Sequence, residues 1–244
     1  MLKNFGCIIL MLVLSVSIGF AEHGPEQGPA EFNGLKFMAQ DKAKADDECD
    51  HGGAALPEFV PTVRDGEPNL ALLEGAKPEA SSLIGDGAWC PQRHCTEYLN
   101  DGFYNNCRSW IIGPIPGWAQ IDIGRVGMVN RVFFGSDHAQ SFLDRVAKDF
   151  DILVATETAD ADSAASTWTK VFTNDPANGA SETTEFKFDT VEARWVRIHV
   201  RGDGGTRIDE IEIYGGSNPF GTPTSVEPRG KLATTWGQLK GSSR

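Results

Sequence analysis

Apolar and polar residues alternate in short segments through the central part of this 244-residue chain. In the segment WAQIDIG (118–124) the alternation is unbroken from Ala119 to Ile123. A period of two is typical of a β-strand with one buried face, because successive side chains of a strand point to opposite sides. The segments RWVRIHV (194–200) and RIDEIEIYG (207–215) have the same character. We therefore predict a strand at each of the three places.

Further short alternating segments lie between these strands and are separated by clusters of Gly, Asn, Asp and Pro. We predict that they form strands at Val129–Gly135, Asp149–Thr156, Thr167–Thr173 and Thr183–Asp189. No strong helical segment and no internal repeat accompanies them. Strands at such regular intervals predict an all-β fold, a β-sandwich or jelly roll.

The three strands of the first paragraph also resemble a known family. A strand of the form W-x-Q-[VI]-D-[LI]-G, a later V-R-I preceded by an aromatic residue or Arg, and a final E-[IF]-E-[VI]-Y-G resemble discoidin, or coagulation factor V/VIII type C, domains. These include many bacterial galactose-binding-like carbohydrate-binding modules. The resemblance covers residues 69–216. It implies a jelly-roll β-sandwich that binds a glycan or polysaccharide through loops at one end.

The first 21 residues are typical of a secretory signal peptide, with Lys3, an apolar run from Cys7 to Val16 and a small-residue ending at Ala21. We expect cleavage after Ala21. A retained membrane anchor is the alternative, but the apolar run is shorter than the ~20 residues that a bilayer requires. The mature chain is therefore expected to be secreted, extracellular or periplasmic, with no membrane span.

Two further segments show no sustained period. Residues 22–68 are acidic and rich in Gly and Pro, and we interpret them as a flexible linker. Residues 217–244 form a Pro/Gly/Ser-rich tail. In the tail, Leu232, Trp236 and Leu239 could share one helical face, so either a docked segment or a frayed terminus fits the pattern. The domain itself is therefore assigned to residues 69–216.

The formal net charge of −12 argues against binding of nucleic acid and against binding of anionic lipid through a basic patch. It is compatible with a neutral sugar or with a cation that carboxylates bind. The sequence contains no nucleophile elbow, zinc helix or phosphate-binding glycine loop. Ser136, Asp137 and His138 are adjacent, but three consecutive side chains can hardly form a catalytic triad. We therefore expect a protein that is not an enzyme, and we keep a small glycan hydrolase in reserve, because a carboxylate pair is defined in space rather than in sequence.

Removal of the signal peptide leaves four cysteines, an even number in a chain sent to an oxidising compartment. They are Cys49, Cys90, Cys95 and Cys107. Four cysteines allow three pairings, and the sequence does not choose among them. Because three of them flank the loops before residue 118, we expect a bridge to Cys107 to fix those loops. A zinc site is the weaker alternative, because the spacing is not the paired C-x2-C form. Metal binding by the acidic cluster at 46–51 is likewise a weak alternative, because an acidic run is usually solvated.

The resemblance also implies a structural calcium site. The turn Asn100-Asp101-Gly102 matches the family's Asp-Gly loop, and Glu210 matches the acidic residue of the terminal strand. Calcium takes six to eight oxygen ligands, which carboxylates and backbone carbonyls supply. Asp101, Asn106 and Glu210 are the expected ligands. An ordinary Asn-Asp-Gly turn remains the alternative, and the loop to Trp110 is longer than the usual family form.

A sugar site needs an aromatic ring to stack on the sugar and polar groups that pair with hydroxyls. Three loops offer this chemistry: 135–145, 89–97 and 202–207. The candidate residues are Asp137, His138, Gln140, Phe142 and Arg145 in the first loop, Trp89 with Arg93 and His94 in the second, and Arg207 in the third. An adhesion or scaffold module that binds a protein or lipid surface through the same loops is the alternative function. The tripeptide at 201–203 spells a known adhesion motif, but it is also good turn chemistry.

Other conspicuous residues receive no binding role. Trp110, Trp118 and Trp195 occupy places where the family buries or half-buries an aromatic residue, so we predict that they pack in the core. His199 alternates with apolar neighbours and is expected to face outward on the sheet.

Overall fold

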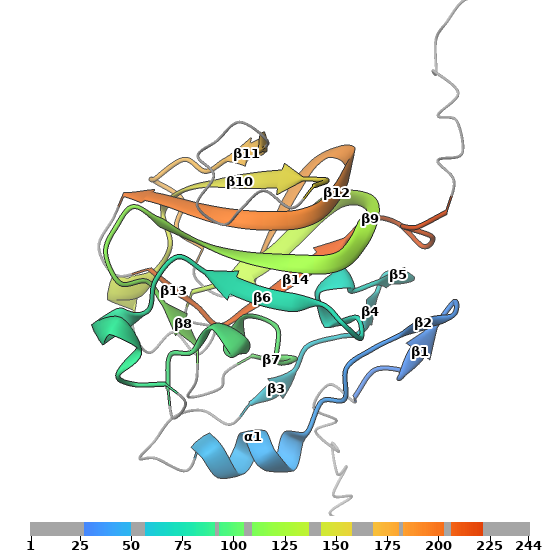
Figure 1. Cartoon of the computed structure of the whole chain (residues 1–244), viewed down its shortest axis with the longest axis horizontal. Helices are drawn as coiled ribbons and strands as arrows, with labels where there is room; N and C mark the ends of the chain where they lie inside the picture. The colour runs from blue at the N-terminus through green and yellow to red at the C-terminus, as the bar shows by residue number, and fades with distance from the viewer. Residues whose placement is uncertain are drawn as a thin grey trace, which may run out of the picture.

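The computed structural model describes residues 27–49, 57–90, 93–104, 109–136, 143–157, 168–180, 183–202 and 206–221. Its main feature is a six-stranded antiparallel sheet (Figure 1). The strands are β6 (Lys77–Ala80), β9 (Gly117–Gly135), β10 (Asp149–Ala155), β11 (Thr169–Thr173), β12 (Thr184–Gly202) and β14 (Glu210–Tyr214). Their order is β11-β10-β12-β9-β14, and β6 pairs with the first half of β9.

Strands β9 and β12 are long and pass through both layers of the fold. The first half of β9 lies between β6 and the end of β12, whereas its second half lies between β14 and the beginning of β12. Register shifts between Lys187 and Val191 and between Ala193 and Trp195 interrupt the pairing of β12 with β9 between the two halves. The halves pack face to face, since the rings of Phe134 and Phe150 lie 5.0 Å apart across the core. The predicted jelly-roll β-sandwich is confirmed.

The predicted strands are confirmed, with some joined and one divided. The segments 118–124 and 129–135 are the two halves of β9, and 183–189 and 194–200 lie in the two halves of β12. The segment 207–215 divides into β13 (Arg207–Ile208) and β14. Strand β13 pairs with β8 (Trp110–Ile111), outside the six-stranded sheet.

Of the three tryptophans predicted to pack in the core, Trp110 alone lies in the main apolar core. Trp110 is fully buried among apolar residues. Trp118 and Trp195 lie instead on the outer face of the sheet, because they share the parity of Gln120 and Arg197, while the intervening residues point into the core. The prediction of core packing is therefore wrong for Trp118, whereas Trp195 is buried, at 8% exposed, but lies outside the main apolar core. His199 faces outward and is partly exposed, as the alternation predicted.

The segment that we interpreted as a flexible linker packs against the domain. It forms β1 (Glu31–Phe32), β2 (Leu35–Lys36), α1 (Lys42–Cys49), β3 (Glu58–Phe59), β4 (Val63–Arg64) and β5 (Glu67–Pro68). Strand β3 pairs with β7 (Phe103–Tyr104), and Phe37 and Val60 belong to the buried core. The described residues of the linker therefore belong to the domain, and the short helix α1 was not predicted.

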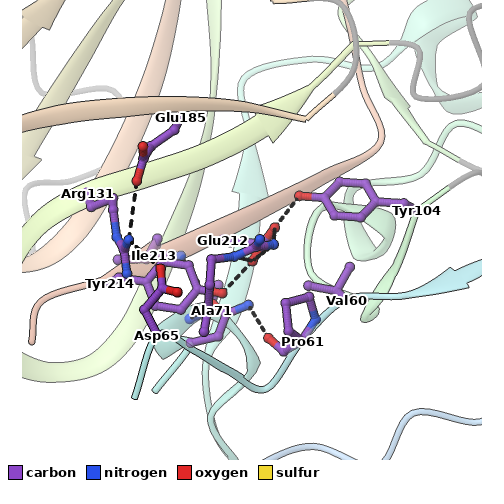
Figure 2. A network of polar contacts seen from close by, with 12 residues as sticks. Val60, Pro61, Asp65, Ala71, Tyr104, Arg131, Glu185, Glu212, Ile213 and Tyr214 are labelled. Atoms are coloured by element: carbon purple, nitrogen blue, oxygen red, sulfur yellow. Dashed lines mark hydrogen bonds and ion pairs between the residues drawn. The ribbon is translucent and has the colours of Figure 1, made fainter. Parts of the chain in front are cut away.

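The N-terminal segment covers the outer face of β14, as Figure 2 shows. Glu212 on this strand is wholly buried. Arg64 of β4 donates to both of its carboxylate oxygens, and the hydroxyls of Tyr104 and Tyr214 donate to one oxygen each. A buried charge is tolerated only when it is paired and hydrogen-bonded. This network therefore explains why a strand with alternating glutamates lies inside the molecule.

In the part of the chain that the structure describes, four short 3-10 helices connect the strands. They are η1 (Leu70–Leu72), η2 (Ile84–Gly87), η3 (Thr96–Leu99) and η4 (Leu143–Arg145). No helix in the described ranges is long and apolar enough to span a membrane. The signal peptide and the tail beyond residue 221 lie outside the described residues.

Candidate functional site

The loop after η2 carries a large exposed aromatic ring. Gly85 and Asp86 of η2 have positive φ angles of 60° and 53°, so the chain turns sharply there. Trp89 follows and is 52% exposed. A Cβ at Gly85 would lie 3.1 Å from Trp89 Nε1, which shows how closely the indole approaches the turn. The turn therefore holds the Trp89 side chain beside it while much of the indole remains in solvent.

A disulfide bond closes this loop. Cys90 and Cys95 are bonded, with their Cα atoms 5.1 Å apart. That spacing lies within the usual range for disulfides, and a five-residue separation in a turning loop achieves it readily. Neither cysteine can therefore pair with Cys107, so our expectation that Cys107 is bridged to this loop is wrong. Cys107 itself lies outside the described residues, and Cys49 ends α1.

Inside the disulfide loop, His94 has an uncommon backbone conformation, with φ at 56°. Its Nδ1 lies 3.2 Å from Ser109 Oγ. Burial lowers the pKa of His94 to about 4, and the charges of Arg207, Arg145 and Arg93 lower it in the same direction. The imidazole is therefore neutral at neutral pH, with one donor and one acceptor nitrogen.

Charged residues of the other two loops selected from the sequence act on His94. Arg145 ends η4 and Arg207 lies on β13, and both are close enough for their charges to act on the imidazole. Arg207 is buried, and its Nε donates to Asp209 Oδ1 at 2.7 Å. The backbone N–H of Asp209 in turn donates to Gly135 O at 3.0 Å. Through Asp209, Arg207 therefore links the loop at 202–207 to the loop at 135–145. Its side chain is buried beneath the candidate binding surface and is not part of that surface.

Several predicted residues lie outside the described part of the chain. These are Asp137, His138, Gln140 and Phe142 in the sugar loop, and Asn106 near the metal loop. Ser109 and Asp209 were not predicted, although they hold His94 and Arg207. Nothing in the local sequence marks either of them, because their role depends on contacts between segments far apart in the chain.

The candidate metal loop brings Asp101 and Glu210 together. The backbone N–H of Gly102 lies 3.3 and 3.4 Å from the two carboxylate oxygens of Glu210, and Phe103 N donates to Asp101 Oδ1 at 3.1 Å. Glu210 is wholly buried. Burial raises the pKa of Glu210 well above its usual range, and the charges of Asp101 and Glu212 raise it further. A cation between Asp101 and Glu210 would relieve both the lost hydration and the repulsion.

The donor set fits a hard cation only in part. Asp101 and Glu210 supply carboxylates, and further ligands would have to be backbone carbonyls or water. Among the described residues, Cys90, Cys95 and Glu97 place potential ligand atoms within 4.8 Å of one another. The two sulfur atoms of this group, however, form the disulfide. The residues therefore fit calcium better than zinc.

No protein-family model and no curated protein matches the chain. Solved structures do resemble it. Chitosan-binding module 1 from a chitosanase/glucanase of Paenibacillus sp. IK-5 is 26% identical, with a TM-score of 0.47 over 60% of this chain and 98% of that one. Module 2 of the same protein, in complex with chitotriose, is 24% identical, with a TM-score of 0.47 over 60% and 100%. CpGH89CBM32-5 from Clostridium perfringens, in complex with GalNAc-beta-1,3-galactose, is 13% identical, with a TM-score of 0.45 over 57% and 95%.

Proposed function

We propose that the chain is a secreted, non-catalytic carbohydrate-binding module that recognises a glycan through the loops at one end of its β-sandwich. One observation carries the proposal: the exposed indole of Trp89 directly precedes the disulfide-closed loop that holds the neutral His94, on which the charges of Arg145 and Arg207 from the other two loops also act. The Cys90–Cys95 bond is in keeping with an oxidising compartment.

The chemistry of these groups suits a sugar. A sugar ring presents a face of C–H groups that packs against an indole, while its hydroxyls need both donors and acceptors. Ser109 occupies Nδ1 of His94, which leaves Nε2 as the nitrogen for a hydroxyl. Arg145 is partly exposed and can donate to hydroxyl oxygens.

We also propose that calcium binds at the Asp101 loop and Glu210 and that its role is structural. When bound, the ion would supply positive charge to two carboxylates that otherwise repel. Gly102 lies between the candidate ligands and the N-terminal segment, because its carbonyl accepts hydrogen bonds from Gln40 Nε2 at 3.0 Å and from Val60 N at 2.8 Å. The ion would therefore strengthen the contact between that segment and the domain without touching the sugar.

A glycan array with the purified mature protein tests the proposed function, and Trp89→Ala is the variant to compare. We expect the wild type to retain at least one glycan and Trp89→Ala to weaken that binding about tenfold, as expected for loss of an aromatic contact. Val126→Ala is the matched control, because Val126 is the other large exposed apolar side chain among the described residues.

Two other outcomes would contradict the proposal. Retention of no glycan would favour the adhesion or scaffold alternative. Release of reducing ends by the pure protein, abolished by substitution of a single carboxylate, would show a hydrolase.

A further inference from the structure

The outer face of the first sheet layer carries three of the six tryptophans of the chain. Trp118 lies on β9, Trp195 on β12, and Trp168 directly precedes β11. Trp118 and Trp168 are partly exposed, whereas Trp195 is only 8% exposed. Aromatic side chains usually lie in the core or at binding surfaces. Their concentration on an outer face therefore needs an explanation that the loop site does not supply.

The two partly exposed rings are held by one guanidinium group. The Arg197 guanidinium carbon lies 4.1 Å from the Trp118 ring centroid and 3.9 Å from that of Trp168. Arg197 Nε donates to Gln120 Oε1 at 2.8 Å, and Gln120 Nε2 donates to Glu79 Oε2 at 2.8 Å. This chain of contacts crosses β12, β9 and β6, so both indoles are fixed before any ligand arrives.

The charged groups around the two rings are paired with one another. Asp151, opposite His199 on the neighbouring strand, accepts from Thr173 Oγ1 at 2.7 Å and lies 3.8 Å from Lys170 Nζ. Arg194 binds Asp122 through two hydrogen bonds of 2.7 Å. A surface of internally paired charges offers donors and acceptors without excess charge. Such a surface is complementary to uncharged hydroxyl groups and gives no particular attraction to a polyanion.

The outer face is continuous with the loop end. Ser81 follows β6, and its backbone N–H donates to Trp118 O at 2.9 Å. The chain then runs directly through η2 to Trp89. The edge of the face that carries Trp118 therefore adjoins the start of the segment that leads to the exposed indole.

We propose that the glycan site continues from Trp89 over the Trp118 edge onto the outer face, so that the protein binds an extended, uncharged polysaccharide chain rather than a terminal sugar alone. This inference rests on the proposed function. Trp89 contacts one end of the bound segment, and the partly exposed Trp118 and Trp168 rings with His199 contact sugar units farther along. A purely structural role of the Trp118–Arg197–Trp168 stack is the competing explanation.

A chain-length series separates the two explanations. Disaccharides and hexasaccharides of galactose, N-acetylglucosamine, glucosamine and mannuronic acid are titrated against the wild type, Trp168→Ala, Trp168→Phe, Trp89→Ala and the Val126→Ala control. For the neutral sugar that binds, we expect Trp168→Ala to raise the Kd of the hexasaccharide about five- to tenfold and to leave that of the disaccharide unchanged. Trp168→Phe should show a smaller loss, and Trp89→Ala should weaken both lengths.

Each outcome of these titrations supports or contradicts the extended site. If the wild type binds a hexasaccharide no more tightly than the disaccharide, or if Trp168→Ala weakens both lengths equally, the extension is wrong while the loop site stands. If no glycan binds the wild type, the proposed function fails and the extension fails with it. If Trp168→Ala does not fold, the Trp168→Phe titrations decide alone.

Discussion

Arg64 holds the buried carboxylate of Glu212 by both oxygens, with Nη2 2.8 Å from Oε1 and Nε 3.2 Å from Oε2. The two residues are 148 positions apart, so the pair fastens the N-terminal segment to the last strand of the sheet. Figure 2 shows Tyr104 and Tyr214 on the same carboxylate. Burial and the charge of Glu212 raise the pKa of Tyr104, which keeps its hydroxyl protonated and able to donate.

The first prediction concerns the removal of this pair. Arg64→Ala should lower the free energy of unfolding by about 3–5 kcal/mol, because it leaves a buried carboxylate without its cation. Urea denaturation measures the change. The double variant Arg64→Ala/Glu212→Gln should recover part of the loss, since the charge that needs a partner is gone. A single variant as stable as the wild type would show that the N-terminal segment is not fastened here.

The second prediction is that calcium stabilises the protein through Asp101 and Glu210. At a concentration of 100 times its Kd, calcium should add about 2.7 kcal/mol to the free energy of unfolding. Asp101→Ala should abolish the calcium-dependent rise in Tm, whereas Trp89→Ala should leave that rise intact. Equal melting temperatures of the wild type in excess calcium and in chelator would contradict the site.

The third prediction is a pH dependence in chelator. The pKa of Glu210 is raised on folding, so as pH rises above 4.5 the unfolded state loses this proton first and the folded state loses stability progressively. The chelated protein should therefore become more stable as pH is lowered from 7 toward 5. Glu210→Gln should remove that trend, and excess calcium should flatten it in the wild type. Thermal melts across this range would contradict the assignment if the wild type and Glu210→Gln showed parallel curves.

The fourth prediction has the opposite sign and belongs to His94. Its pKa falls from 6.5 to about 4 on folding, so the unfolded chain takes up this proton first as pH falls. The contribution of His94 to stability should be complete above pH 6.5 and lost between 6.5 and 4. His94→Asn should remove this component, because asparagine tolerates a positive φ but does not titrate there. A difference between the two melting curves that is constant with pH would contradict the prediction.

The fifth prediction concerns the Cys90–Cys95 bond. Closing so short a loop is worth about 2 kcal/mol in the unfolded chain, so Cys90→Ser/Cys95→Ser should lower the free energy of unfolding by that amount. The same change should weaken glycan binding, because Trp89 and His94 lose their fixed backbone. A reductant should reproduce both effects in the wild type and have neither effect in the double variant. Unchanged binding after reduction would show that the bond does not order the site.

The sequence predicted the strands well because alternation is a local property. In β9 and β12, the alternation of positions also predicts which face of the sheet a side chain occupies better than the residue type does. Trp118 shares the parity of Gln120, and Trp195 shares that of Arg197. This places both tryptophans on the outer face, although the family resemblance predicted the core.

Burial of the N-terminal segment could not be predicted in the same way. Its strands β1 to β5 have only two residues each, which is too short for a period to appear. The surface that it covers includes Glu212, which alternates with isoleucines as a solvent-facing residue of a strand would. Arg64 and Tyr104, which come from distant segments, bind Glu212 and make this part of the face interior.

The candidate site was predictable as loops but not as a geometry. The family resemblance related Asp101 to Glu210, and the presence of aromatic and polar side chains marked the loops of Trp89, Arg145 and Arg207. The contacts that position His94 and Arg207 depend on Ser109 and Asp209. Ser109 directly precedes β8, and Asp209 directly follows β13. The pairing of these two strands could not be predicted from any local sequence pattern.

The hairpin of β1 and β2 lies beside the point where the described chain ends, because Asn33 Nδ2 donates to Ser217 O at 3.2 Å. In Figure 1 this pole is opposite the end that holds β8 and β13. A polypeptide joined near the β1–β2 hairpin or near residue 221 would therefore leave the molecule at the pole opposite β8 and β13. A domain or cell surface attached at this pole would not obstruct Trp89. The loops at the other end could then bind a polysaccharide while the protein stays anchored.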